Sequence, residues 1–196
     1  MLDSDALDCL FLKARSQNGW RDTPVTDEQL QSLYELLKWA PTSANSQPAR
    51  FLFLRSKEAK EKLRPALAPG NIDKTMAAPV VAIIAHDLDF HERLPEFFPH
   101  NPGFADLFRG DEKRPMRESF AFRNGSLQGA YLMMAARSIG LDCGPMSGFD
   151  QGKVDDLFFA GSSLRSNFLC SLGYGDPAKV MDRLPRMPFE QACQLL

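Results

Sequence analysis

Apolar residues in the N-terminal part of the chain recur at the spacing of amphipathic helices. That spacing predicts a helix over 4–15, with Ser4 as its candidate N-cap. Thr26 and Gln29 form a capping box ahead of further apolar positions, which predicts a second helix over 26–39. The chain is therefore expected to open with two helices.

Short runs rich in Val, Ile, Leu and Phe alternate with further helical patterns. We expect strands over 51–54, 79–86, 141–146 and 167–172, with 79–86 as the central one, and helices over 57–63 and 152–159. No internal repeat is present, and no linker is long enough to divide the chain. The pattern predicts a single domain, residues 1–196, of the α/β or α+β class with a three-layer core.

The region between the second and third strands has a different character. Residues 87–118 combine prolines, phenylalanines and charges, which predicts a long insertion with short helices over a binding cleft. Its apolar surface for a lid or an interface would come from Phe97, Phe98, Phe104 and Phe108. A helix over 119–138 should follow, largely buried and capped by Gly140, with Leu127, Ala130, Tyr131 and Met134 as its apolar positions.

Composition and charge exclude several classes of protein. With 196 residues, 44% of them hydrophobic and 24% charged, the chain is globular rather than disordered, collagen-like or coiled coil. A net charge of -2 gives no field to hold a polyanion, so we expect no nucleic-acid partner. The longest apolar run, over 77–85, is far shorter than the roughly 20 residues of a membrane span. With an acidic start unlike a signal peptide, the chain is expected to be cytoplasmic.

Several common catalytic motifs are absent from the sequence. The four cysteines lie far apart, and we interpret them as reduced structural thiols. The three histidines lack the spacing of metal ligands, so no metal site is expected. The sequence also contains no nucleophile elbow, Walker A motif or dinucleotide fingerprint.

Four segments carry candidate chemistry. The polar loop 41–48 could cap a helix end, or its amides Asn45 and Gln47 could bind the edge of a planar heterocycle. Asn71 and Lys74 share one face if their segment is helical, although a lone lysine is more often solvated surface. The small-residue turn 144–150 would let backbone approach a ligand closely, or would be a tight turn only.

The fourth candidate is a set of cations near both ends of the chain. If the termini converge, Arg15 could hold a phosphate together with Lys179, Arg183 and Arg186, and Ser16 would add a hydroxyl. Otherwise these residues are scattered surface cations.

Together these segments resemble the nitroreductase family of flavoenzymes. The resemblance rests on Arg15-Ser16, the stretch 39–48, Asn71 with Lys74, the turn 144–150 and Arg186, in the family's order. More narrowly, five segments are similar to the branch that contains the malonic semialdehyde reductase of bacterial pyrimidine degradation. They are 18–20, 122–124, 144–150, 158–161 and 172–176.

The resemblance implies an α+β fold, a three-layer sandwich whose mostly antiparallel sheet is flanked by helices. It also implies a homodimer that binds FMN in two sites at the subunit interface. The FMN phosphate would be bound by Arg15, Ser16 and Arg186, with Arg183 as a second terminal cation. The flavin would be approached from the partner subunit by Thr42, Ser43 and Asn45, with Gln47 as a further contact.

The same resemblance places Asn71 and Lys74 at the pyrimidine edge of the flavin, and puts backbone amides near N5 and O4 from Pro145, Met146, Ser147 and Gly148. A reduced flavin carries negative charge at N1 and O2, so a cation such as Lys74 would ease hydride acceptance from NADH or NADPH. Because the flavin itself carries the hydride, no side-chain nucleophile or metal is needed.

Two positions depart from the family pattern. Many nitroreductases have a basic residue where this chain has Asn18, and several have an acid where it has Ser147. The loss of an acid beside the substrate pocket suits an anionic substrate such as malonic semialdehyde. Arg123, or an arginine within 106–118, could pair with its carboxylate.

Three functional hypotheses follow from the sequence. The first is an FMN-dependent NAD(P)H oxidoreductase that reduces malonic semialdehyde to 3-hydroxypropanoate. The second is a broad nitroaromatic or quinone reductase on the same scaffold, which would share every flavin contact. The third is a non-catalytic flavin-binding protein whose 87–118 insertion binds a partner.

Overall fold

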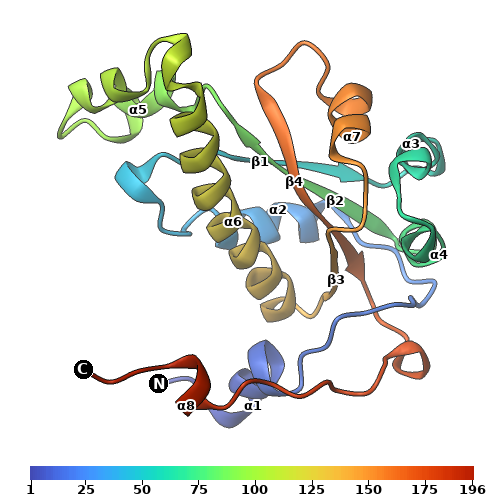
Figure 1. The fold of residues 1–196 in the computed structure, drawn as a ribbon. Coiled ribbons are helices and arrows are strands. Elements are labelled where there is room, and N and C mark those ends of the chain that lie inside the picture. Colours follow the sequence, from blue (N-terminus) through green and yellow to red (C-terminus); the bar gives the residue numbers. More distant parts are fainter.

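The most apolar strand of the chain lies inside a four-stranded sheet. In the computed structural model, which describes residues 1–196, the strands are β1 Ala49–Leu54, β2 Val80–Asp87, β3 Asp142–Met146 and β4 Leu164–Gly173 (Figure 1). Their order is β1-β2-β4-β3, and every neighbouring pair is antiparallel. All four predicted strands are present. β1 and β4 begin two and three residues earlier than expected, because backbone pairing extends them beyond their apolar runs.

Helices cover both faces of this sheet, which gives the expected three layers (Figure 1). On one face lie α2 Asp27–Leu37 and α6 Arg114–Ser138. The other face is covered by α3 Lys57–Leu63, α4 Ile72–Met76 and α7 Gln151–Phe158. Each face has its own core, one around Leu33 and Leu132 and the other around Leu63 and Val154. The capping box of Thr26 and Gln29 begins α2 as predicted.

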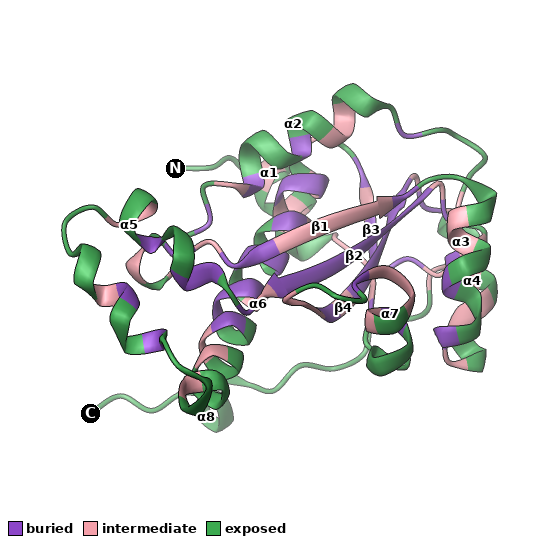
Figure 2. Ribbon diagram, turned by 90° about the horizontal axis from the view of Figure 1, so that it is seen from above, coloured by how far each residue is buried: buried purple, intermediate pink, exposed green.

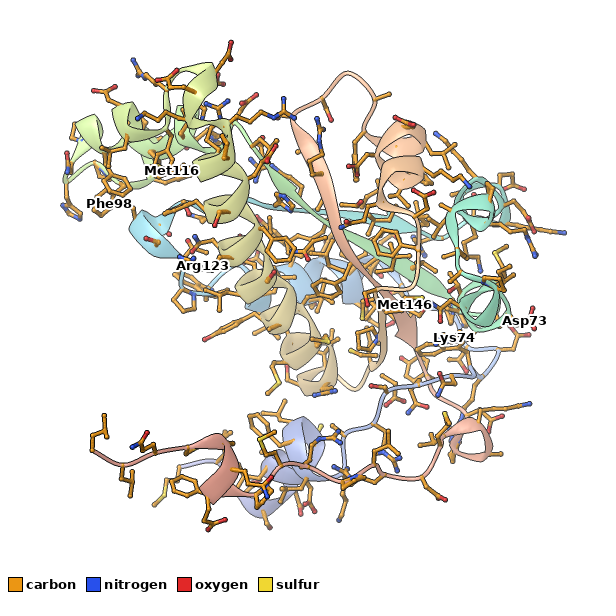
Figure 3. The ribbon with its side chains drawn as sticks, in the orientation of Figure 1. Asp73, Lys74, Phe98, Met116, Arg123 and Met146 are labelled. Carbon is orange, nitrogen blue, oxygen red and sulfur yellow. The ribbon has the colours of Figure 1, made fainter.

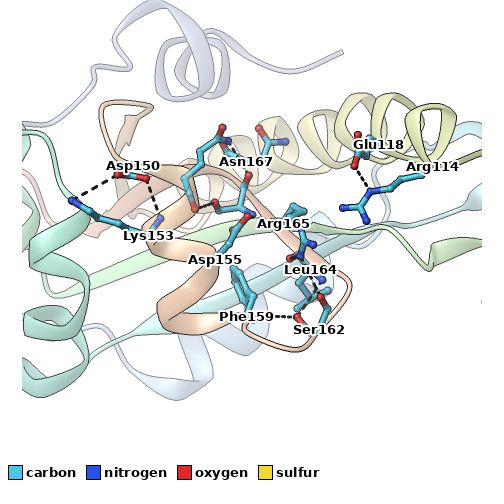
Figure 4. A network of polar contacts seen from close by, with 12 residues as sticks. Arg114, Glu118, Asp150, Lys153, Asp155, Phe159, Ser162, Leu164, Arg165 and Asn167 are labelled. Carbon is cyan, nitrogen blue, oxygen red and sulfur yellow. Dashed lines mark hydrogen bonds and ion pairs between the residues drawn. The ribbon is translucent and has the colours of Figure 1, made fainter. Parts of the chain in front are cut away.

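Polar contacts fix α7 against the sheet. The Asp155 carboxylate accepts a hydrogen bond from the Ser166 amide at 2.7 Å, and the Gln151 amide donates to the Ser166 carbonyl at 3.0 Å (Figure 4). Because Ser166 is near the start of β4, these contacts secure the strand where it extends beyond its apolar run.

The long helix α6 is buried along a different face from the one expected. Its apolar positions Leu127 and Tyr131 are 47% and 42% exposed, so the prediction of a largely buried helix was wrong (Figure 2). Apart from Leu132, the buried stripe contains small and polar residues: Ala121, Asn124, Gly125, Gln128, Gly129, Ala135 and Ala136. A Cβ on Gly129 would lie 2.5 Å from Phe168, so this glycine lets the helix approach the sheet. Gly140, with φ of 81°, ends the helix as predicted.

The insertion contains four short helical turns, and it ends earlier than expected because α6 begins at Arg114. Its turns are 3-10 helices Phe90–Arg93, Pro102–Phe108 and Asp111–Lys113, and α5 Leu94–Phe97. The predicted apolar surface is mostly internal. Phe98, Phe104 and Phe108 pack around the buried Phe90 in a separate small core. Their apolar area is therefore used to hold the insertion together.

The C-terminal arm passes beside the N-terminal segment, where Arg183 donates to the Leu12 carbonyl and Arg15 donates to the Met181 carbonyl. The first helix, α1 Ser4–Leu7, continues as a π-helix over Asp8–Leu12, and so ends before the expected Arg15. Its N-cap is Asp3 rather than Ser4, because the Asp3 carboxylate accepts from the Ala6 amide. The C-terminal arm forms a 3-10 turn, Pro177–Lys179, and α8 Phe189–Ala192. None of the helices has the length and apolar character needed to cross a membrane.

We predict that Gly129→Ala destabilises the protein by about 1–3 kcal/mol, because the added methyl would overpack α6 against Phe168. Helix propensity alone predicts the opposite sign, a gain of up to about 1 kcal/mol. Gly152→Ala is the matched control, since Gly152 is exposed in α7. Urea unfolding of both variants measures the difference. A stabilised Gly129→Ala protein would show that α6 has room to move from the sheet.

Candidate functional site

A basic pocket lies where the two ends of the chain meet. It has a volume of about 430 Å³, and its lining includes Arg15, Ser16, Arg137, Arg183 and Arg186. Asp182 is the one acid among the lining residues. Four arginines against one carboxylate give this pocket a positive potential, which suits an anionic group. The predicted convergence of Arg15 with the C-terminal cations is therefore present.

Arginine side chains hold the C-terminal arm in place. Arg15 donates a hydrogen bond to the Met181 carbonyl, and Arg183 donates to the Leu12 carbonyl at 2.6 Å. Arg137 of α6, which sequence reasoning missed, donates to the Leu10 carbonyl at 3.0 Å. Lys179 lies outside this pocket, because its side chain packs against Gly19. No local pattern could identify Arg137, since α6 reaches the pocket only through the tertiary fold.

The segment after Arg15 connects the basic pocket with Lys74. Ser16 forms an isolated parallel bridge with Cys143 of β3, and the next amide donates to the Cys143 carbonyl at 2.9 Å. Lys74 Nζ donates to Asn18 Oδ1 at 3.4 Å, and Trp20 Nε1 donates to the Lys74 carbonyl at 2.9 Å. Asn18, which the sequence marked only as a departure from the family pattern, thus orients the Lys74 ammonium.

Asn71 and the turn after β3 lie beside Lys74. Asn71 Nδ2 donates to the Gly148 carbonyl at 2.8 Å, and a Cβ at Gly148 would lie 2.5 Å from that nitrogen. Met146 accepts a hydrogen bond from the Thr75 hydroxyl at 3.3 Å, so the turn is also bound to α4. Figure 3 shows Lys74 and Met146 on the same flank of the molecule. Glycine at position 148 is required for this close approach.

Arg15, Ser16, Asn71, Lys74 and the 145–148 turn therefore form one continuous strip. Its basic pocket suits a phosphate, and its other end offers an ammonium, amides and backbone groups to a planar polar ring. Gln17, within the same strip, is buried and its Oε1 has no hydrogen-bond partner. The strip presents donors at both ends, and its middle is formed by backbone of β3.

The polar loop 41–48 has an unusual backbone. Ala44, Asn45 and Gln47 have φ of 51°, 47° and 43°, and they are the only residues other than glycine with positive φ. Each costs on the order of 1 kcal/mol or more in this region. Strained backbone persists only where the surrounding structure imposes it, and such sites often have functional roles. The strain makes this loop a candidate functional segment.

The loop lies away from the strip. Asn45 Nδ2 donates to the Phe97 carbonyl at 2.9 Å, which places the loop beside the insertion. Phe98, the next residue, lies on the opposite flank from Lys74 and Met146 (Figure 3). A single chain therefore does not bring the loop and the strip together. The resemblance assigns the loop to the flavin of the partner subunit, and the observed separation is compatible with that assignment.

Two buried amide side chains of α6 contact the loop and were missed by the sequence analysis. Asn124 Oδ1 accepts from the Ser43 amide at 2.8 Å, and Gln128 Oε1 accepts from the Ala49 amide at 2.9 Å. Arg123, the candidate substrate cation, is the neighbour of Asn124. It is exposed and makes no ion pair or hydrogen bond within the chain.

Two of the histidines are buried in structural positions. Burial lowers the pKa of both His86 and His91, with the charge of Asp155 opposing the shift at His86. His86 lies at the end of β2 and makes an edge-on contact with Phe122, and His91 lies in the insertion. Neither belongs to the strip.

Comparison with known proteins agrees with this geometry. The sequence model described as the nitroreductase family matches residues 12–174. The chain is 60% identical over 195 residues, with 100% of both chains covered, to a Cupriavidus pinatubonensis protein named "Putative NADH dehydrogenase/NAD(P)H nitroreductase".

Solved structures show the same fold. A Bacillus subtilis protein named as a nitroreductase matches with a TM-score of 0.89 at 20% identity, covering 99% of this chain and 100% of that one. An Exiguobacterium sibiricum protein, also named as a nitroreductase and solved in complex with FMN, matches with a TM-score of 0.81 at 19% identity, covering 100% and 99%. The predicted fold class is thus confirmed.

We predict that Ala44→Gly raises the free energy of unfolding by up to about 1 kcal/mol, because glycine adopts positive φ without strain. The matched control is Ala130→Gly, at an exposed position inside α6, which should lower it by about 1 kcal/mol. Urea unfolding measures both variants. If Ala44→Gly also destabilised the protein, the left-handed backbone of Ala44 would carry no strain that glycine relieves.

Proposed function

The chain belongs to the nitroreductase family, and on that premise we propose that it is an FMN-dependent NAD(P)H oxidoreductase. The observation that carries this proposal is the strip that runs from the four-arginine pocket past Lys74 to the 145–148 turn. We further propose that its substrate is malonic semialdehyde, which it reduces to 3-hydroxypropanoate in pyrimidine degradation.

The residues of the strip fit FMN. The basic pocket offers Arg15, Ser16, Arg183 and Arg186 to the phosphate, and Arg137 adds a fifth candidate donor. Gly148 lets Asn71 approach the backbone of the turn, because a side chain there would collide with Asn71. Lys74 and Asn71 face the same region with donor groups, which suits the carbonyl-rich edge of the ring.

Bound FMN would supply hydride transfer between the nicotinamide cofactor and the substrate. The chain's own residues hold and polarise it. Lys74 would keep a positive charge at the pyrimidine edge, where Asn18 orients the ammonium and Trp20 binds the Lys74 carbonyl. Pro145 has no backbone N–H group. Hydrogen bonds toward N5 and O4 would therefore come from the backbone amides of residues 146–148.

We propose that the protein is a homodimer and that the 42–47 loop completes the partner's site. The outward face of α6 carries the apolar side chains Phe122, Leu127 and Tyr131. Further exposed apolar residues lie in the first helix and the C-terminal arm: Leu7, Phe11, Leu12, Leu184, Met187 and Phe189. A chain that buries polar amides on one face of α6 and exposes apolar residues on the other is typical of an oligomer subunit.

The substrate assignment depends on charge. Arg123 is exposed and free of ion pairs within the chain, next to the residue that anchors the loop. A free guanidinium near the loop would bind the carboxylate of malonic semialdehyde. The alternative, a broad nitroaromatic or quinone reductase, needs no such cation. It uses the same flavin residues.

We expect the purified protein to bind FMN, to bleach anaerobically with NADPH or NADH, and to recover its colour with malonic semialdehyde. Visible absorption spectra follow each step.

Arg123→Ala should raise the KM for the semialdehyde by about tenfold or more, because it removes one charge-assisted hydrogen bond to the substrate carboxylate, and it should leave quinone reduction unchanged. The control is Arg93→Ala, which removes an arginine paired with Glu96 in the insertion.

Each result has a distinct meaning. Bleaching without recovery by the semialdehyde, but with recovery by a quinone, would favour the broad reductase. An FMN protein that no nicotinamide cofactor reduces would favour the non-catalytic hypothesis. A protein that takes up no FMN would contradict the proposed function.

We predict that Lys74→Met slows flavin reduction by NADPH about 100-fold, because it removes a preorganised positive charge from the site where negative charge develops. Stopped-flow bleaching at saturating FMN measures this rate. Lys153→Met is the matched control on the same flank, since Lys153 is exposed and pairs only with Asp150. A Lys74→Met rate within threefold of wild type would remove Lys74 from the proposed mechanism.

A further inference from the structure

Two amide side chains occupy the buried face of α6 among apolar residues. Asn124 is 2% exposed and Gln128 is 4% exposed, and they are four residues apart on one face of the helix. Buried amides are unfavourable unless they form hydrogen bonds, so their presence requires a specific partner. The other buried positions of this helix are alanine, glycine and leucine.

Both amides contact backbone at the two ends of one short segment. Asn124 Oδ1 accepts from the Ser43 amide at 2.8 Å, while its Nδ2 donates to the Phe120 carbonyl at 2.9 Å. Gln128 Oε1 accepts from the Ala49 amide at 2.9 Å. The segment from Ser43 to Ala49 is therefore fixed to α6 at its start and at its end.

The backbone between these two anchors is the strained part of the chain. Its backbone amides bond locally: the Asn45 amide donates to the Thr42 carbonyl at 3.0 Å, the Ser46 amide to the Ser43 carbonyl at 3.1 Å, and the Gln47 amide to the Thr42 hydroxyl at 3.2 Å. These contacts are local, so they do not determine where the loop lies relative to the rest of the fold. Two further contacts reach the rest of the fold: Asn45 donates to the Phe97 carbonyl of the insertion, and the Pro48 carbonyl accepts from the Asp87 amide of β2 at 2.8 Å, next to the Ala49 anchor.

The glycines of α6 make this anchoring geometrically feasible. Gly125 and Gly129 each follow one of the amides, and a Cβ on Gly125 would lie 3.0 Å from His86 Cβ. Close packing of α6 on β2 and β4 brings Asn124 and Gln128 within hydrogen-bond distance of the loop. In each pair, the glycine allows α6 to pack close to the sheet, and the amide side chain then lies near enough to accept a hydrogen bond from the loop.

We propose that Asn124 and Gln128 are positioning residues that hold the 42–47 loop in the left-handed conformation with which it completes the flavin site of a second copy of this chain. The inference rests on the proposed function, which places the loop against the partner's FMN. Without the two acceptors, the amides of Ser43 and Ala49 would lose their partners and the strained loop would relax toward ordinary φ values. The loop would then present Ser43 and Asn45 in the wrong orientation.

The test uses the FMN-loaded protein and the variants Asn124→Ala and Gln128→Met. Hydrogen–deuterium exchange of the amides from 43 to 49 should become about tenfold faster or more, since the lost hydrogen bonds protect them. The dissociation constant for FMN should rise about tenfold or more in parallel. At saturating FMN the rate of flavin reduction should stay within about threefold of wild type, because Lys74 is untouched.

Asn167→Ala is the matched control. Asn167 of β4 is also a buried amide, and its Nδ2 donates to the Ser126 hydroxyl of α6 at 2.9 Å. It lies beside Asp155 and Arg165 (Figure 4) and makes no hydrogen bond to the loop. This variant should lower the melting temperature about as much as Asn124→Ala, without faster exchange over 43–49 and without weaker FMN binding. If Asn124→Ala does not fold, Gln128→Met provides the same measurement at the other end of the loop.

Two results would overturn the proposal. One is unchanged exchange over 43–49 in both variants, which would show that other contacts fix the loop. The other is faster exchange with unchanged FMN affinity, which would show that the shape of the loop does not matter to the flavin. A failure of the proposed function is distinguishable, because then the wild-type protein itself would bind no FMN or would not be reduced by NAD(P)H.

Discussion

The close approach of α6 to the sheet is the constraint on which most of the structure depends. Gly125 and Gly129 remove the side chains that would otherwise meet His86 and Phe168, so the helix packs against β2 and β4. Glycine inside a helix costs roughly 1 kcal/mol relative to alanine. That cost is offset by a contact face that places buried amides next to backbone.

The same helix joins three regions that are distant in sequence. Near its start, Ala121 belongs to the small core of the insertion; in its middle, Asn124 and Gln128 anchor the strained loop. Near its end, Arg137 binds the Leu10 carbonyl and lines the basic pocket. Loop, insertion and pocket are therefore positioned by one rigid element, which gives the proposed cofactor site a defined geometry.

Polar groups rather than apolar area account for the placement of the candidate site. Arginines from both ends of the chain donate to backbone carbonyls and so bring the termini together around a positive pocket. Asn71 binds the Gly148 carbonyl, and Asn18 binds Lys74, which extends the pocket into a continuous strip. Such contacts leave the cations close to one another, a state that an anionic ligand stabilises by neutralising their repulsion.

The sequence predicted correctly those elements whose signal is local, and it failed where contacts with distant segments determine which residues are buried. The capping box at Thr26 and the apolar run of β2 identify their elements without reference to the rest of the fold. The buried face of α6 was predicted wrongly, because Leu127 and Tyr131 are apolar and yet exposed, while the glycines beside them are buried. Hydrophobic periodicity reports only where apolar residues recur, so it does not detect a helix whose buried face is formed mainly by glycine and alanine.

The order of helices and strands, the family resemblance and the candidate residues of the strip could be read from residue type and short-range spacing. The positive φ of Ala44, the hydrogen bond from the Ser43 amide to Asn124 and the place of Arg137 in the pocket could not. Each of these three depends on contacts between residues far apart in the chain. An alanine in left-handed backbone, in particular, has no local signal, because its conformation is imposed by the helix that packs beside it.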